Sequence, residues 1–131
     1  MNPRVTLLAG GLFGATGVIG GAFGAHALRA FLIARGMAEV WETAVHFQLV
    51  HAVALVGLAA WSRGELAPVA ARRCARAALC WSAGLVFFSG SLYLLAAGAP
   101  RWVGPVTPLG GLALIAGWLF LASVPFAAKK G

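Results

Sequence analysis

Histidine and carboxylate side chains are the first candidates for chemistry, and this sequence holds few of them. The chain has three histidines and three glutamates, and it has no aspartate. Glu42 and His46 are four residues apart, which places them on one face of a helix, but two ligands do not make a metal site. His26 would have to be the third ligand, and no cysteine–histidine spacing suggests zinc. We therefore expect no metal and no cofactor.

His51 differs from the other histidines because it falls well inside an apolar segment. Histidine can titrate near neutral pH, so His51 is a candidate for relaying a proton or contacting a ligand. The alternative is a structural hydrogen bond between two helices. The sequence leaves both hypotheses open.

Nucleophilic catalysis finds little support in the sequence. Cys74 and Cys80 are six residues apart on one expected helix, so they face different directions and an intramolecular disulfide is not expected. Neither cysteine has an activating partner, and no serine–histidine–acid set or phosphate-binding loop is recognisable. We expect a protein that is not an enzyme. The absence of charged residues deep in the apolar segments also argues against a proton-coupled exporter.

The elements that position these residues are expected to be membrane-spanning helices. The chain is 61% hydrophobic and only 10% charged, whereas a soluble domain carries about 25% charged residues. Its net charge of +7 can indicate nucleic-acid binding, but no soluble basic face is present, so we expect no nucleic-acid partner. Four segments of 20 residues or more lack any Asp, Glu, Lys or Arg, and each is long enough to cross a bilayer once.

The sequence therefore predicts an all-α membrane protein, a four-transmembrane-helix bundle. Its helices are expected at about 5–28, 38–62, 70–98 and 108–128, within a single membrane domain, 1–131. Gly36 is expected to break the first connector ahead of an amphipathic extension of the second helix, and Pro68 suits the start of the third. Pro100, Pro105 and Pro108 predict that the last connector is not helical.

The basic residues predict the direction of the helices, because Lys and Arg are enriched in cytoplasmic connectors. Seven of them lie on the side that holds both termini and the middle connector, and three lie on the other side. The seven are Arg4, Arg63, Arg72, Arg73, Arg76, Lys129 and Lys130, and the three are Arg29, Arg35 and Arg101. This bias predicts that both termini are cytoplasmic.

Glycines form a stripe along the first expected helix. They recur at spacings of four, three, four and three residues, which places Gly10, Gly14, Gly17, Gly21 and Gly24 on one face. Glycine lowers helix propensity, so such a row indicates close packing of helix backbones. The fourth expected helix carries Gly110 and Gly117 in a similar pattern. The first stripe can pack inside one protomer or form the seam of a homo-oligomer, and the sequence does not separate the two.

Polar side chains gather in the outer halves of the expected helices. The candidate polar cluster is His26, Glu42, Thr43, Gln48, His51, Ser89, Ser91, Tyr93 and Thr107. Polar groups inside a bilayer are costly unless they have partners, and ionisable ones are functional candidates. The cluster is therefore either a binding site or a set of interhelical hydrogen bonds.

Several motifs resemble one known family. They are GAFGAHAL at 21–28, WETAVHFQ at 41–48, HAVAL at 51–55, FSGSLYLL at 88–95 and GPVTPLGG at 104–111, ending at Gly117-Trp118. In order and spacing these resemble the YgdD family of small bacterial inner-membrane proteins, which has no assigned function and small eukaryotic transmembrane relatives. The resemblance implies a multi-pass protein of the bacterial inner (cytoplasmic) membrane. It also implies that the candidate polar cluster matches the family, whereas His46 falls at a variable position.

Two functional hypotheses follow. The first is a non-enzymatic membrane protein that binds a membrane partner, which is either a lipid or a protein complex, with a homo-oligomer as a further option. The second is a small-solute carrier or channel that acts as an oligomer through the polar cluster, because four helices leave little room for a pore between them.

Overall fold

The computed structural model describes residues 1–127, and this part of the chain is helical with no strand. The elements are α1 (Pro3–Ala25), α2 (Arg29–Ala34), α3 (Ala38–Trp61), α4 (Pro68–Ala96), η1 (Arg101–Val103), α5 (Val106–Ala122) and η2 (Val124–Ala127). Four helices within residues 1–127 are long and apolar enough to cross a membrane, and the fourth of these spans includes η1. The expected fold class is therefore confirmed in two respects: the described chain is helical, and it contains four long apolar helices.

Local sequence signals account for most helix ends. The Asn2 side chain accepts a hydrogen bond from the Val5 backbone N–H at 2.9 Å and caps α1. Pro68 occupies the first turn of α4, where its missing N–H costs nothing. Gly36 and Gly98 have φ values of 65° and 104°, a region that favours glycine, and they end α2 and α4 respectively.

Two expected boundaries differ from the structure. α1 ends at Ala25 rather than near 28, because His26 has a non-helical backbone conformation. The prediction of a non-helical last connector is wrong, since it contains the 3-10 turn Arg101–Val103 and Pro108 lies in the first turn of α5. Proline is compatible with a first turn because those N–H groups have no intrahelical acceptor.

The predicted C-terminal end of the fourth span falls partly on residues that the structure does not describe. α5 ends at Ala122, and η2 follows it as far as Ala127. Residue 128, the expected end, lies outside the described residues, as do Lys129 and Lys130.

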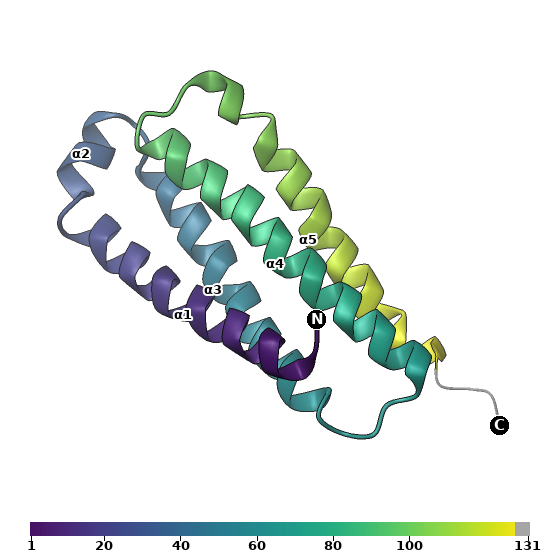
Figure 1. The fold of residues 1–131 in the computed structure, drawn as a ribbon. Helices are drawn as coiled ribbons and strands as arrows, with labels where there is room; N and C mark the ends of the chain where they lie inside the picture. Colours follow the sequence, from purple (N-terminus) through teal and green to yellow (C-terminus); the bar gives the residue numbers. More distant parts are fainter. Residues whose placement is uncertain (128–131) are drawn as a thin grey trace.

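The four long helices lie side by side in chain order, as Figure 1 shows. α3 packs on both α1 and α4, and α4 packs on both α3 and α5, whereas α1 and α4 barely touch. The core lies where α3, α4 and α5 meet, around the fully buried Trp81, Leu55 and Leu85. Large apolar side chains cover the outward faces, as expected for surfaces that contact lipid.

The glycine stripe of α1 lies against α3 of the same chain. A Cβ added at Gly17 would lie 2.7 Å from Leu49 Cδ2, and one at Gly10 would lie 3.1 Å from the Ala52 carbonyl oxygen. Gly24 lies against Trp41 in the same way. This face is thus covered within one chain.

The remaining glycines of the two sets also lie against a neighbouring helix of the same chain. Gly14 and Gly21 also lie over α3, although with more room. Gly110 and Gly117 lie against α4, at Phe88 and Trp81 respectively. The two glycine sets therefore pack on separate neighbours and not on each other.

Candidate functional site: a lateral groove between α1 and α4

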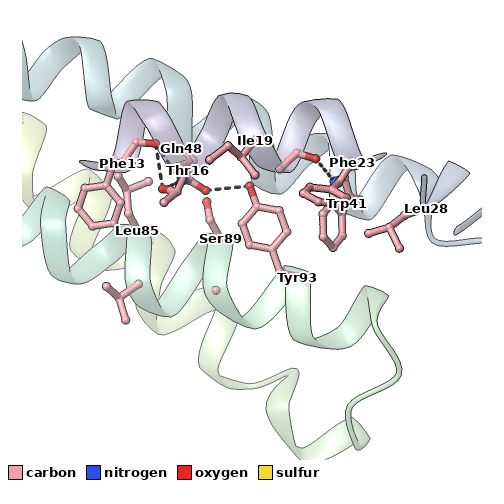
Figure 2. A pocket seen from close by; sticks show the side chains of 13 residues that line it. Phe13, Thr16, Ile19, Phe23, Leu28, Trp41, Gln48, Leu85, Ser89 and Tyr93 are labelled. Atoms are coloured by element: carbon pink, nitrogen blue, oxygen red, sulfur yellow. Dashed lines mark hydrogen bonds between the residues drawn. The ribbon is translucent and has the colours of Figure 1, made fainter. Parts of the chain in front are cut away.

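The weak contact between α1 and α4 leaves a groove whose floor is α3. Its volume is about 540 Å³, within the range of about 300–1,000 Å³ that is usual for small-molecule sites. The lining residues are Phe13, Thr16, Ile19, Gly20, Phe23, Leu28, Trp41, Gln48, Leu85, Val86, Ser89, Gly90 and Tyr93. Figure 2 shows these side chains between the two helices.

Two glycines keep the groove open. A Cβ at Gly90 would meet no atom within 4 Å, so packing does not require glycine there. A Cβ at Gly20 would lie 3.3 Å from the Tyr93 hydroxyl oxygen. The rim consists of Ile19, Phe23 and Val86, each of which is more than half exposed, so the groove opens sideways toward lipid.

A chain of hydrogen bonds crosses the floor of the groove. The Tyr93 hydroxyl donates to Gln48 Oε1 at 2.8 Å, and Gln48 Nε2 donates to Thr16 Oγ1 at 2.7 Å and to the Phe13 carbonyl oxygen at 2.9 Å. Thr16 in turn donates to the Leu12 carbonyl oxygen at 2.7 Å. Figure 2 shows Tyr93 reaching from α4 to Gln48 on α3, and so the chain ties three helices together.

Trp41 and Ser89 complete the polar lining. The Trp41 indole N–H donates to the Gly20 carbonyl oxygen at 2.8 Å, and its ring meets that of Tyr93 edge-on with centroids 4.6 Å apart. The Ser89 hydroxyl donates to the Ala44 carbonyl oxygen at 2.8 Å. Trp41 therefore closes the end of the groove near α2, and Ser89 binds α4 to α3.

The hydrogen bonds of the lining side chains determine which ligands the groove can bind. Each polar side chain in the lining already donates its hydrogen, and the lining residues include no charged side chain. Hydroxyl and amide oxygens keep acceptor capacity beyond one hydrogen bond. The groove can thus accept a hydrogen bond from a neutral ligand, but its side chains offer nothing to neutralise an ion.

His51 is not part of this groove, although it lies only three residues from Gln48. Its Nδ1 lies 2.8 Å from the Phe47 carbonyl oxygen, and its Nε2 lies 3.0 Å from the Trp118 indole nitrogen. A carbonyl only accepts and an indole N–H only donates, so these partners fit the neutral ring with its proton on Nδ1. The ring also lies edge-on to Trp81 and Trp118, with centroids 6.1 Å and 5.8 Å away. His51 therefore joins α3 to α5 on the other side of α4.

The candidate polar cluster separates into independent contacts. Ser91 Oγ lies 2.6 Å from Thr107 Oγ1, a pair that joins α4 to the start of α5. His26, Glu42 and Thr43 are exposed, and Thr43 donates only to the Glu39 carbonyl oxygen in its own helix. Of the nine members, Gln48, Ser89 and Tyr93 line the groove. Residues 1–127 hold no group of three His, Cys, Asp or Glu side chains that could bind a metal.

Three residues of these contacts were not among the predicted site residues. Thr16 lies nine residues before Ala25 on α1 and receives the Gln48 hydrogen bond, while Trp41 and Trp118 donate indole hydrogens. Trp41 and Trp118 both lie within or at the end of the motifs that carry the family resemblance. A buried indole N–H usually has an acceptor, and this signal would have pointed to Trp41 and Trp118. It would also have pointed to Trp81, whose buried Nε1 has no hydrogen-bond partner among residues 1–127.

Four apolar spans that are tied together by buried hydrogen bonds define a small multi-pass membrane protein. Comparisons with known proteins agree with this class. A family described as "Protein of unknown function (DUF423)" matches residues 20–111. The chain belongs to this family, whose members are also called UPF0382 membrane proteins.

Relatives resemble the chain over nearly its whole length. The UPF0382 membrane protein SH2409 of Staphylococcus haemolyticus is 39% identical over 118 residues, covering 90% of this chain and 92% of the relative. A UPF0382 membrane protein of Haemophilus influenzae is 34% identical over 130 residues, covering 98% of each. The UPF0382 inner membrane protein YgdD of Escherichia coli is 36% identical, covering 92% of this chain and 88% of YgdD. No solved structure matches the chain. The expected family and the location in the bacterial inner membrane are thereby confirmed.

Proposed function

We propose that this protein is a non-catalytic membrane protein that binds a neutral amphiphilic lipid in the groove between α1 and α4. The observation that carries the proposal is the lining, which is apolar at the rim and offers only acceptors on its floor. An apolar chain would fill the space beside Phe13, Ile19 and Val86. A hydroxyl or amide hydrogen of the ligand would bond to the Tyr93 or Ser89 oxygen.

The lateral opening of the groove suits a lipid chain. A lipid chain enters sideways from the bilayer without crossing a polar layer, and the exposed rim leaves that route open.

Transport of a charged solute has weaker support. The lining contains no charged side chain, and His51, which would be the natural proton carrier, lies outside the groove between Phe47 and Trp118. The second hypothesis, a carrier or channel, therefore lacks a specific observation in its favour.

We also propose that both termini face the cytoplasm. The support is the excess of basic residues at the end of the helices that holds Arg4, Arg63 and Arg76. The residues that line the groove lie mainly in the opposite half of the spans, near α2, and this orientation would open the groove to the outer leaflet.

Lipid photolabelling tests the proposed function. The protein would be reconstituted in liposomes with a diazirine-bearing diacylglycerol, and the labelled peptides would be identified by mass spectrometry. We expect labelling of peptides that contain residues 13–23 and 85–93. Gly90→Leu should remove most of this labelling, because the new side chain enters the groove where no atom lies within 4 Å of its Cβ.

Gly11→Leu is the matched control. Gly11 also has no atom within 4 Å of an added Cβ, but it does not line the groove. It should leave the labelling of both peptides unchanged. Equal labelling of the native protein and Gly90→Leu at these peptides would refute the proposal.

A further inference from the structure

A second depression lies at the other end of the molecule, where α4 begins and α5 ends. Its volume is about 430 Å³, and its lining consists of Arg73, Arg76, Ala116, Leu119, Phe120 and Ser123. Two guanidinium groups thus stand at one end of a largely apolar surface. No acidic side chain belongs to this lining in the part of the chain that the structure describes.

Contacts with α5 hold both arginines in place. Arg73 donates from one guanidinium nitrogen to the Ser123 carbonyl oxygen, at the C-terminal cap of α5. The Arg76 guanidinium carbon lies over the Phe120 ring, 5.7 Å from its centroid, a distance at which a cation and a ring attract. Because an arginine has five N–H donors, most donors of the pair have no partner among residues 1–127.

The surface beside the arginines is apolar and faces lipid. Leu119 is 66% exposed, and Ala116 lies one helical turn before Phe120 on α5, further from the basic end. A ligand that fills the depression therefore needs a negative charge at one end and a hydrocarbon chain at the other.

We propose that this depression binds an anionic phospholipid, with its phosphate diester between Arg73 and Arg76 and an acyl chain along Ala116 and Leu119. Guanidinium groups bind phosphate oxygens through paired hydrogen bonds, and basic pockets between membrane helices are suited to anionic headgroups. The site shares no residue with the groove between α1 and α4, so each proposal can fail without the other.

Native mass spectrometry of the detergent-solubilised protein tests this site. The probes are phosphatidylglycerol and phosphatidylcholine with the same acyl chains. We expect the native protein to retain phosphatidylglycerol preferentially. Arg76→Gln should weaken this retention about five-fold, because one basic residue near a headgroup contributes about 1 kcal/mol and about 1.4 kcal/mol corresponds to ten-fold.

Arg72→Gln provides the matched control. Arg72 is exposed on the same turn of α4 but does not line the depression, so its loss removes the same charge and should change retention less than two-fold. Equal losses in the two variants would show general attraction to the basic end and would overturn the proposal. Arg73→Gln should also weaken retention, but it removes the contact with Ser123 as well, so Arg76→Gln is the deciding variant.

A third measurement distinguishes binding of a phospholipid from binding of free phosphate. Inorganic phosphate at millimolar concentration should not displace phosphatidylglycerol, because it lacks the chain that contacts Ala116 and Leu119. Complete displacement by inorganic phosphate, or equal retention of the two lipids, would overturn the assignment.

Discussion

Replacing Gly110 with alanine should separate α5 from α4. The added Cβ would lie against the Phe88 backbone nitrogen, and it would lie 2.8 Å from the Phe87 carbonyl carbon. These are backbone atoms of a helix, which cannot rotate away as a side-chain end can. The contact between the two helices must therefore open to admit the methyl group.

The magnitude can be worked from two opposing effects. Forcing an extra methyl group into a well-packed contact costs about 1–3 kcal/mol, and the backbone contacts at Gly110 place this change at the upper end. Alanine has a higher helix propensity than glycine, and this difference stabilises the helix by about 1 kcal/mol. We expect Gly110→Ala to lower the free energy of unfolding by about 2 kcal/mol, the difference between these effects.

The same substitution at Gly11 should have the opposite sign. An added Cβ there meets no atom within 4 Å, so only the gain in propensity of up to about 1 kcal/mol remains. Unfolding of both variants in mixed micelles, with increasing sodium dodecyl sulfate, measures the difference. A Gly110→Ala protein that is as stable as the native one would contradict the close approach of α4 and α5.

Three further predictions concern hydrogen bonds and orientation. Tyr93→Phe should lower stability in the same assay by about 0.6 kcal/mol, the average for a hydrogen bond between membrane helices, because the bond to Gln48 is lost; an unchanged stability would contradict that contact. A double-mutant cycle of His51→Phe and Trp118→Phe should give a coupling energy of about 0.6–1.7 kcal/mol, and additive effects would show that the two rings do not bond. A fluorescent protein fused after the C-terminus should fluoresce and an alkaline phosphatase fused there should be inactive, whereas active phosphatase would reverse the proposed orientation.

The number and rough position of the spans could be predicted from the sequence because charge is so costly in a bilayer. The four charge-free windows run from Arg4 to Arg29, from Glu42 to Arg63, from Arg76 to Arg101 and from Arg101 to Lys129, and each has room for one crossing. The short helix α2 was not predicted, since six residues are too few to show a periodic pattern. The order of the helices was also beyond prediction, because lipid-facing and protein-facing residues are both apolar.

The candidate site was predicted only in part. Gln48, Ser89 and Tyr93 were named, and they lie together, but depth in the bilayer did not separate them from His51 and Ser91. The spacing of these residues in the sequence could have separated Ser91 from the groove residues. Ser89 and Tyr93 are four residues apart and share a face of α4, whereas Ser91 lies two residues from each and faces α5. The direction of His51 depends on a long-range contact with α5, which spacing within one helix does not reveal.

The arrangement of the helices in chain order has a consequence for how the protein is made. α1 and α3 form one hairpin and α4 and α5 form another, and each hairpin has its main interface between neighbours in the sequence. Such a topology has low contact order, which favours rapid folding. The N-terminal hairpin can close its glycine interface while α4 is still being synthesised. The late step is then the docking of two finished hairpins, and the Gln48–Tyr93 hydrogen bond forms only in that step.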